Sequence, residues 1–402
     1  MANTDIKWFS SDDFNAPTLP ANWDVLIDVI DACLVNGYGS QGFSLINISN
    51  GVAVVTFNSN HSFKQFQVIK ISGASNPMLN KEFKVLGLSP TTVEFLIDLP
   101  DQTITEVMSA QLAPLGWKKS FSGIGKAVYQ AKNKIKNPFY LRVDSTKDAS
   151  YPASYTKFAK VGILETCSGI DDLSATQAPF SSDDPNRNWV GQSNYSGWAK
   201  WKYAIADTAS ADQTSTLVGN RKWFIVGNDT CFYFVIRASI GANFEIPYGF
   251  GSLDVNGSPR PFLLSNLFYD QSSNTITATS SLANPALGLV SGLYDYVNSL
   301  ANTSAFRLTT GFGNAPSGAT ANTIKADPVG GYYLTPFYLI DPNNYILGQL
   351  PLVSSCINNA STEISGSIYK DEQEAHMLNG FRVRNSSASL IGMLFFKIYE
   401  GE

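Results

Sequence analysis

The sequence predicts a mainly β protein with a minor helical part (α+β). We expect antiparallel sheets or a sandwich, one prominent N-terminal amphipathic helix and a small inserted β-barrel. Apolar and polar residues alternate over many short runs, the pattern of half-buried strands. Helical spacing is clear in a single stretch near the N-terminus. Charged residues are only 15% of the 402 residues, below the usual share of about a quarter, and Ser, Thr and Asn take their place.

The predicted helix lies within Trp23 to Gly39. Its apolar positions recur three and four residues apart, and three aspartates occupy the opposite face. The apolar positions are Val25, Leu26, Ile27, Val29, Ile30, Cys33 and Leu34, and the aspartates are Asp24, Asp28 and Asp31. We expect Asn22 to cap the first turn and Gly37 to end the helix in a left-handed conformation. A lone amphipathic helix needs a sheet to cover, so we predict a strand set on its apolar side and a solvated acidic edge.

The pattern changes to period two after Ser44. Leu45 to Ile48 and Val52 to Phe57 flank Asn50-Gly51, the strongest short signal for a β-hairpin. Further strands are expected at 66–71, 83–88, 92–96 and 103–112. The domain organisation we predict is 1–43 for the arm and helix of the main domain, 44–112 for the inserted barrel, 113–284 for the main β domain and 285–402 for a C-terminal β-rich region.

Strands are also expected further along the chain. Lys222 to Val226 and Cys231 to Ile236 are apolar on both faces, which places this hairpin in the middle of a buried sheet. Tyr248 to Gly251 is interpreted as a tight turn before a surface segment that ends at Pro259-Arg260-Pro261. Apolar spacing predicts a second helix from Pro285 to Leu300. The remaining expected strands are 127–129, 139–143, 331–340, 345–350, 362–369, 380–383 and 390–399.

Composition limits the function classes. The net charge of −5 gives no reason to expect a nucleic-acid partner. The four cysteines (Cys33, Cys167, Cys231 and Cys356) form no Cys-x-x-Cys pair, so neither a zinc site nor a disulfide framework is predicted. We expect no signal segment, no membrane span and synthesis in a reducing cytoplasm.

Motifs for catalysis or cofactor binding are scarce. The two histidines, His61 and His376, are far apart in sequence, and we interpret both as structural or solvated residues. Neither a phosphate-binding glycine loop nor a dinucleotide fingerprint is present. Asp254-Val255-Asn256-Gly257 has a weak similarity to a calcium loop but lacks its later bidentate acid. We therefore assign no catalytic, cofactor-binding or metal-binding residue, and we expect no enzyme activity and no cofactor.

Two groups of residues keep other functions open. Paired acids near tryptophans could line a sugar groove and cleave glycosides; these are Asp171, Asp172, Asp183, Asp184, Trp189, Trp198 and Trp201. A run of cations without acids could contact a phosphate backbone, although a solvated face is its ordinary interpretation; these are Lys118, Lys119, Lys126, Lys132, Lys134, Lys136 and Arg142.

Several segments together carry a resemblance. They are Phe9-Ser10-Ser11 with Ala16-Pro17, Leu26 to Gly39, Gly116-Trp117 with Phe121-Ser122-Gly123, Lys126 to Tyr129, and Tyr140 to Asp144. In these segments the chain resembles a family of bacteriophage virion structural proteins. Within 44–112, the segments His61-Ser62-Phe63, Val68 to Gly73 and Leu79-Asn80 resemble a small barrel of phage tail and particle proteins. The Gly-Asp turn usual in that barrel is replaced around Gln65-Phe66-Gln67.

The resemblance implies a role in particle architecture and carries over no catalytic residue. We expect a non-enzymatic subunit of the tail, baseplate or neck that contacts other phage structural proteins, forms a homo-oligomer and resides in the virion. The alternatives are a capsid-decorating protein, or a tail protein that binds or cleaves a host-surface glycan.

Overall fold

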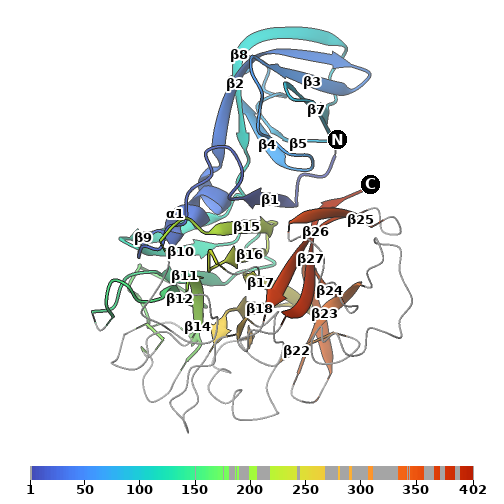
Figure 1. The fold of residues 1–402 in the computed structure, drawn as a ribbon. Coiled ribbons are helices and arrows are strands. Elements are labelled where there is room, and N and C mark those ends of the chain that lie inside the picture. Colours follow the sequence, from blue (N-terminus) through green and yellow to red (C-terminus); the bar gives the residue numbers. More distant parts are fainter. Residues whose placement is uncertain are drawn as a thin grey trace.

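The computed structural model describes residues 2–149, 151–174, 176–180, 199–205, 218–241, 245–267, 334–341, 345–356, 366–371, 376–384 and 390–401, with short pieces at 186, 188–189, 279–280, 289–291, 307–310 and 343. Over these residues the protein is mainly β, and its sheets are antiparallel, as the sequence predicts (Figure 1). Among the described helices, none has the length and apolar character needed to cross a membrane.

The described strands form four sheets. The central sheet has the order β1 (Lys7–Ser10), β15 (Lys222–Gly227), β16 (Phe232–Arg237), β17 (Ile246–Val255), β18 (Ser258–Leu264) and β21 (Leu289–Ser291). The outer sheet runs β20 (Thr279–Ser280), β19 (Asn266–Leu267), β14 (Ala199–Ala204), β12 (Lys157–Leu164), β11 (Tyr140–Asp144), β10 (Lys126–Gln130) and β9 (Lys118–Gly123), and β13 (Gln177–Ala178) pairs with β12.

The other two sheets lie beside this pair (Figure 1). The half-barrel has the order β5 (Glu82–Lys84), β4 (Val68–Ser72), β8 (Gln102–Leu112), β2 (Tyr38–Ser49), β3 (Val52–Phe57), β7 (Thr92–Leu96) and β6 (Gly87–Leu88). The C-terminal sheet has the order β22 (Arg307–Thr310), β23 (Leu334–Ile340), β24 (Ile346–Cys356), β27 (Leu390–Glu400), β26 (His376–Arg384) and β25 (Ser367–Asp371).

The central sheet is buried on both faces. On one face Ile225 and Phe234 belong to a core shared with the outer sheet. On the other face Phe224 and Val235 belong to a second core shared with the C-terminal sheet. Because successive side chains of a strand point to opposite faces, two buried faces require strands that are apolar at nearly every position. The predicted buried hairpin is therefore confirmed as β15 and β16.

The helix is present but shorter than expected. It comprises α1 (Leu26–Asp31), which continues as one π-helical segment, η1 (Ala32–Asn36). The prediction that Asn22 caps it is wrong, because Val25 is the N-cap residue. Asp24 has a positive φ of 71°, and its N–H donates to Ser145 O at 3.2 Å. The chain before the helix is thus held against the end of β11 instead of continuing the helical turn.

The acidic edge of the helix is only partly solvated. Asp28 is exposed, but Asp31 accepts hydrogen bonds from Lys119 Nζ at 2.5 Å and from Tyr129 Oη at 2.7 Å. The apolar side packs in the core shared by the outer and central sheets. Gly37 does have a positive φ of 73°, but its ψ of 171° is extended rather than left-handed helical. A Cβ on Gly37 would lie 2.4 Å from Leu112 O, so a glycine is required where the chain enters β2.

The half-barrel begins at Tyr38, a few residues before position 44, where the alternating pattern predicts its start. Its β2–β3 turn is Asn50-Gly51, with φ of 51° and 75°, as the mirror-image hairpin turns require. The strand β2 already begins at Tyr38, since it pairs with β8 as far as Leu112. Facing rings of Phe83 and Phe95 stack at 4.1 Å in the interior. The end strands β5 and β6 are not paired with each other in the described structure, so the sheet is a half-barrel rather than a closed barrel.

Ion pairs, hydrogen bonds and a ring contact attach the half-barrel to the rest of the protein. Lys7 on β1 forms an ion pair with Glu82 at 2.7 Å. Lys84 is buried and donates to Ile6 O at 2.6 Å. Phe66, which has a positive φ of 67°, stacks on Tyr399 of β27 at 4.8 Å. The half-barrel therefore contacts both the first and the last strand of the chain.

The predicted tight turn and the surface segment expected after it are strand residues in the structure. Tyr248 to Gly251 lies inside β17, and Pro259 to Pro261 lies inside β18. A Cβ at Gly251 would lie 2.3 Å from Cys231 Cβ, so this glycine serves close packing between strands rather than a turn. The turn is Asn256-Gly257, where both residues have positive φ and Gly257 N–H donates to Asp254 Oδ1 at 2.7 Å. The segment with weak similarity to a calcium loop is thus a β-hairpin turn.

The second predicted helix is wrong where it can be seen. Residues Leu289–Ser291 form β21 and pair with β18, with Leu289 opposite Leu264. The rest of 285–300 lies outside the described residues. Apolar residues spaced by three and four can also line a buried strand, so the spacing did not distinguish the two structures. The expected C-terminal strands correspond to β23 to β27.

We predict that the pH dependence of stability depends on Lys84. Burial, with a smaller effect of the nearby Lys7 charge, lowers the pKa of Lys84 from 10.5 to about 7. Between these pH values the unfolded chain binds one proton more than the folded chain. The free energy of unfolding should therefore rise with pH, by at most about 1.4 kcal/mol per unit from this group.

Urea unfolding of wild type and Lys84→Met at pH 7, 8 and 9 measures this contribution. The difference in unfolding free energy between the two proteins should change with pH, whereas the exposed Lys81→Met should follow the wild-type slope. Equal slopes for wild type and Lys84→Met would contradict the prediction.

Candidate functional site

The predicted acid pair Asp171-Asp172 lies on the segment that follows β12. Asp171 forms ion pairs with Lys126 at 2.8 Å and with Arg142 at 3.2 Å. Asp172 accepts hydrogen bonds from the hydroxyls of Ser168 and Ser174, both at 2.6 Å. The other predicted acids, Asp183 and Asp184, and Trp198 lie outside the described residues.

These contacts stabilise the charged form of both carboxylates. The hydrogen bond from Lys126, aided by the charges of Lys126 and Arg142, lowers the pKa of Asp171. The hydrogen bonds from Ser168 and Ser174 lower the pKa of Asp172. A glycosidase acid needs the opposite shift, because it must carry a proton at working pH. The Asp171-Asp172 pair is therefore unsuited to the acid role.

The two described tryptophans of this region are core residues. Trp189 is buried, and its Nε1–H donates to Gln177 Oε1 at 2.7 Å. Trp201 has no exposed surface, and its Nε1–H donates to Leu264 O at 2.9 Å. A sugar platform needs an exposed ring face, and neither residue provides one.

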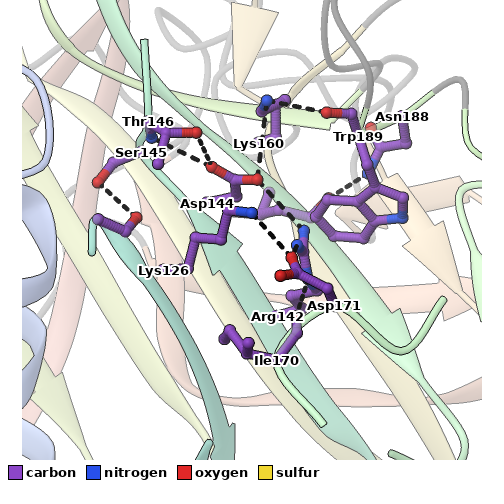
Figure 2. A network of polar contacts seen from close by, with 12 residues as sticks. Lys126, Arg142, Asp144, Ser145, Thr146, Lys160, Ile170, Asp171, Asn188 and Trp189 are labelled. Carbon is purple, nitrogen blue, oxygen red and sulfur yellow. Dashed lines mark hydrogen bonds and ion pairs between the residues drawn. The ribbon is translucent and has the colours of Figure 1, made fainter. Parts of the chain in front are cut away.

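A buried polar network on the outer sheet connects Asp171 and Trp189 (Figure 2). Arg142 and Asp144 lie on β11, and Lys160 on β12 is the partner of Asp144 across the two strands. Residues two apart on a strand and a directly opposite residue share one face. All three side chains therefore meet on one face of the sheet, and each is at most 4% exposed.

Asp144 is the centre of the network. Its Oδ2 lies 3.5 Å from Arg142 Nη1 and 3.7 Å from Lys160 Nζ, and its Oδ1 accepts from the Thr146 N–H at 3.1 Å. Lys160 also contacts Asp148 at 3.2 Å and donates to Trp189 O at 2.9 Å.

Arg142 connects the network to the segment after β12. Its Nε–H donates to Ile170 O at 3.0 Å, and its guanidinium carbon lies 4.4 Å from the centre of the Trp189 ring. Gly162, opposite Arg142 on β12, leaves room for that ring, since a Cβ there would lie 2.5 Å from Trp189 Cζ2. The network thus fastens Ile170, Asp171 and Trp189 to the outer sheet.

The basic run does not form one continuous patch. Lys119 pairs with Asp31, Lys126 pairs with Asp171, and Arg142 is buried in the network. Lys134 and Lys136 are exposed on the loop after β10. Arg142, grouped with the lysines by sequence, belongs instead to the network, which the sequence pattern did not predict. The sequence signal for the network was the alternation Arg142-x-Asp144 within an apolar strand. Lys160, whose charge is opposite to that of Asp144, lies in the following strand.

The histidine that the structure describes in full has a structural role. The ring of His61 accepts a hydrogen bond from the Phe63 N–H at Nδ1 (3.2 Å). The ring proton is therefore on Nε2, since one nitrogen of a neutral imidazole accepts and the other donates. Nε2 lies 2.7 Å from Ser89 O and 2.9 Å from Thr92 O, so His61 joins two turns of the half-barrel. His376 lies on β26, and its side chain is outside the described residues.

The described cysteines and acids do not gather into a metal site. Burial raises the pKa of Cys231 to about 12 and raises that of Cys33, so both thiols stay protonated and unreactive. The described residues contain no group of three or more His, Cys, Asp or Glu side chains that could hold a metal ion.

Comparison with known proteins adds no relative. No protein-family model matches the chain, and no curated protein matches its sequence.

We predict a large stability difference between two substitutions in the network. Asp144→Asn leaves the buried charges of Arg142 and Lys160 short of a counter-charge, which should lower the free energy of unfolding by about 3 kcal/mol. Asp171 is 65% exposed, so Asp171→Asn should cost less than about 1 kcal/mol. Chemical denaturation of the two variants and of wild type measures both values. Equal losses would mean that Asp144 does not organise the network.

Proposed function

We propose that the protein is a non-enzymatic structural subunit of a bacteriophage particle, associated with the tail, baseplate or neck, and that it acts through contacts with other particle proteins. The observation that carries the proposal is that the charged side chains near the predicted sugar site are held in structural contacts. Asp144, Asp171, Arg142 and Lys160 form ion pairs among themselves and hydrogen bonds to the backbone. These contacts fasten Ile170, Asp171 and Trp189 to the outer sheet. This is a contribution to rigidity rather than to proton transfer.

The half-barrel offers a second line of support. Its strands β2 and β8, of 12 and 11 residues, pair along most of their length and carry the other strands away from the layered sheets (Figure 1). A module on such a stiff pair of strands presents its surface to a neighbour without blocking the body. Val107 of β8 is 88% exposed there. The resemblance of the N-terminal segments and of this module to phage proteins points to the same class.

Two alternatives remain as rivals. A capsid-decorating protein would use the same contacts at another position on the particle. A glycan-cleaving tail protein would need a proton donor, and the lowered pKa values of Asp171 and Asp172 disfavour these two residues in that role.

The proposal predicts that the chain is a component of intact virions. Gradient-purified particles of the phage that encodes it should contain several copies per particle by quantitative mass spectrometry. Antibody against the recombinant protein should label the tail-proximal end in electron micrographs, and pre-incubation of the antibody with recombinant protein should abolish the labelling. Labelling of the capsid surface would select the decoration role, and absence from intact particles would overturn the proposal.

The proposal also predicts that the recombinant protein releases no reducing ends from envelope polysaccharide of the host. Wild type and the Asp171→Ala, Asp172→Ala, Asp183→Ala and Asp184→Ala variants should all match the buffer control in a reducing-sugar assay. Release by wild type that is lost in any of these variants would establish the enzyme instead.

A further inference from the structure

The turn between β10 and β11 presents an apolar side chain between two cations. Lys134, Ile135 and Lys136, here called the basic turn, are all exposed, and Ile135 is 88% exposed. Neither lysine forms an ion pair with another described residue. A single exposed isoleucine is ordinary on a protein surface, but this one is held in a fixed position.

Hydrogen bonds from both sides fix the basic turn to the turn between β15 and β16. The Asn133 N–H donates to Asp229 O at 2.9 Å, and the Asn133 side-chain amide donates to Asp229 Oδ2 at 3.0 Å. Asn137 Nδ2 donates to Thr230 O at 2.9 Å, and the Asn137 N–H closes the turn on Asn133 O at 2.9 Å. A turn held in this way loses little conformational entropy when a partner binds.

Strand β7 of the half-barrel carries the complementary arrangement. Glu94, Leu96 and Asp98, here called the acidic strip, alternate with buried residues and therefore point outward on one face. All three are exposed, and neither acid forms an ion pair within the described part of the chain. Leu96 is opposite Val52 and Glu94 is opposite Val54 on β3, which extends the apolar part of this face.

The two surfaces lie in regions of opposite charge. Residues 38–63 contain no Asp, Glu, Lys or Arg, and residues 86–112 contain four acids and no Lys or Arg, a charge of −4. Residues 107–143 contain seven Lys and Arg side chains and no acid. Complementary charge of this kind speeds the encounter of two surfaces and fixes their register.

The acidic strip lies too far from the basic turn of its own molecule for a contact. Leu96 is opposite Val52, which is opposite Ser49, the last residue of β2. The eleven residue steps from Tyr38 to Ser49 span roughly 35 Å along an extended strand. The strip is therefore at the end of the half-barrel that projects away from the layered sheets, whereas the basic turn lies on those sheets (Figure 1).

We propose that the basic turn of one copy docks on the acidic strip of a second copy of this chain. The two lysines pair with the two acids, and Ile135 packs on Leu96 between the pairs. The acids are four residues apart on an extended segment, roughly 13 Å, and flexible lysine stems can span this spacing. Because the two surfaces differ, the contact can repeat from copy to copy and close into a ring.

The inference names a second copy as one partner of the proposed structural subunit, and in that respect it rests on the proposed function. Self-association is measured on the isolated full chain, and position in the particle is measured on virions. A chain that is found in virions and never self-associates would overturn only this inference. A chain that associates through these surfaces and is absent from virions would overturn only the role in the particle.

Sedimentation equilibrium of the full chain tests self-association. At low ionic strength the chain should associate reversibly with a micromolar Kd. Association should weaken in about 1 M salt, where the Debye length is about 3 Å. A chain that stays monomeric at millimolar concentration in low salt, or association that salt leaves unchanged, would overturn the proposal.

Two charge reversals locate the contact. Lys134→Glu with Lys136→Glu, and Glu94→Lys with Asp98→Lys, should each raise the Kd about tenfold or more, because like charges then face each other. An equimolar mixture of these two double variants should associate again, because each turn then meets a strip of opposite charge. Ile135→Ser should raise the Kd about fivefold through loss of the apolar contact.

Lys147→Glu with Lys222→Glu is the matched control, since it changes the net charge by the same amount. Both lysines are exposed and lie beyond or at the ends of β11 and β15 that are away from the basic turn. This variant should leave the Kd unchanged, and circular dichroism verifies that each variant is folded. Equal weakening by the control and by the basic-turn variant, or a mixture that fails to associate, would overturn the proposal.

Discussion

The architecture depends on a central sheet that is covered on both sides. Its strands β15 and β16 contribute Ile225 and Phe234 to one core and Phe224 and Val235 to the other. A strand in this position can tolerate few polar side chains, since each face excludes water. The outer and C-terminal sheets then have their positions fixed by the two faces they cover. The helix α1 fits into the first of these cores and does not organise the fold, although it is the clearest periodic signal in the sequence.

The buried charges of the outer sheet follow from the same layering. Arg142, Asp144 and Lys160 lie on its buried strands, and desolvated charges are tolerated only when they pair and accept or donate further hydrogen bonds. Here the carboxylate of Asp144 lies between the cations of Arg142 and Lys160. The backbone carbonyls of Ile170 and Trp189 accept further hydrogen bonds from these two cations. Of the residues that suggested a sugar groove, Asp171 and Trp189 are thereby explained as parts of this network.

Local signals in the sequence were reliable where a single physical cause determines the structure. Asn50-Gly51 forms the expected hairpin turn, in which both residues have positive φ. Asn and Gly adopt positive φ more readily than other residues, so this turn favours them. The stretches around Ile225 and Phe234 are apolar on both faces, and they form central strands because only a sheet covered on both sides buries both faces. The charge network was not predicted, although β11 and β12 follow each other in sequence, because the register that places Lys160 opposite Asp144 leaves no periodic signal.

The errors have equally specific causes. The sequence pattern predicts a turn at Gly251, yet Cys231, which directly precedes the adjacent strand β16, lies so close that no side chain fits. The helix was extended back to Asn22, whereas a backbone hydrogen bond from Asp24 to Ser145 holds that segment elsewhere. In both cases a tertiary contact outweighed local preference, and such contacts leave no periodic trace in the sequence.

The pairing of Tyr38 with Leu112 has a consequence for how such a chain can change over evolutionary time. The two ends of the half-barrel leave the body on adjacent strands, so a link of a few residues would bridge the gap if the whole module were deleted. Closing a short gap costs little entropy, and the central, outer and C-terminal sheets would keep all their described strands. Gain, loss or exchange of this module is therefore compatible with retention of these three sheets, which would let a lineage vary the surface of the module while conserving the rest.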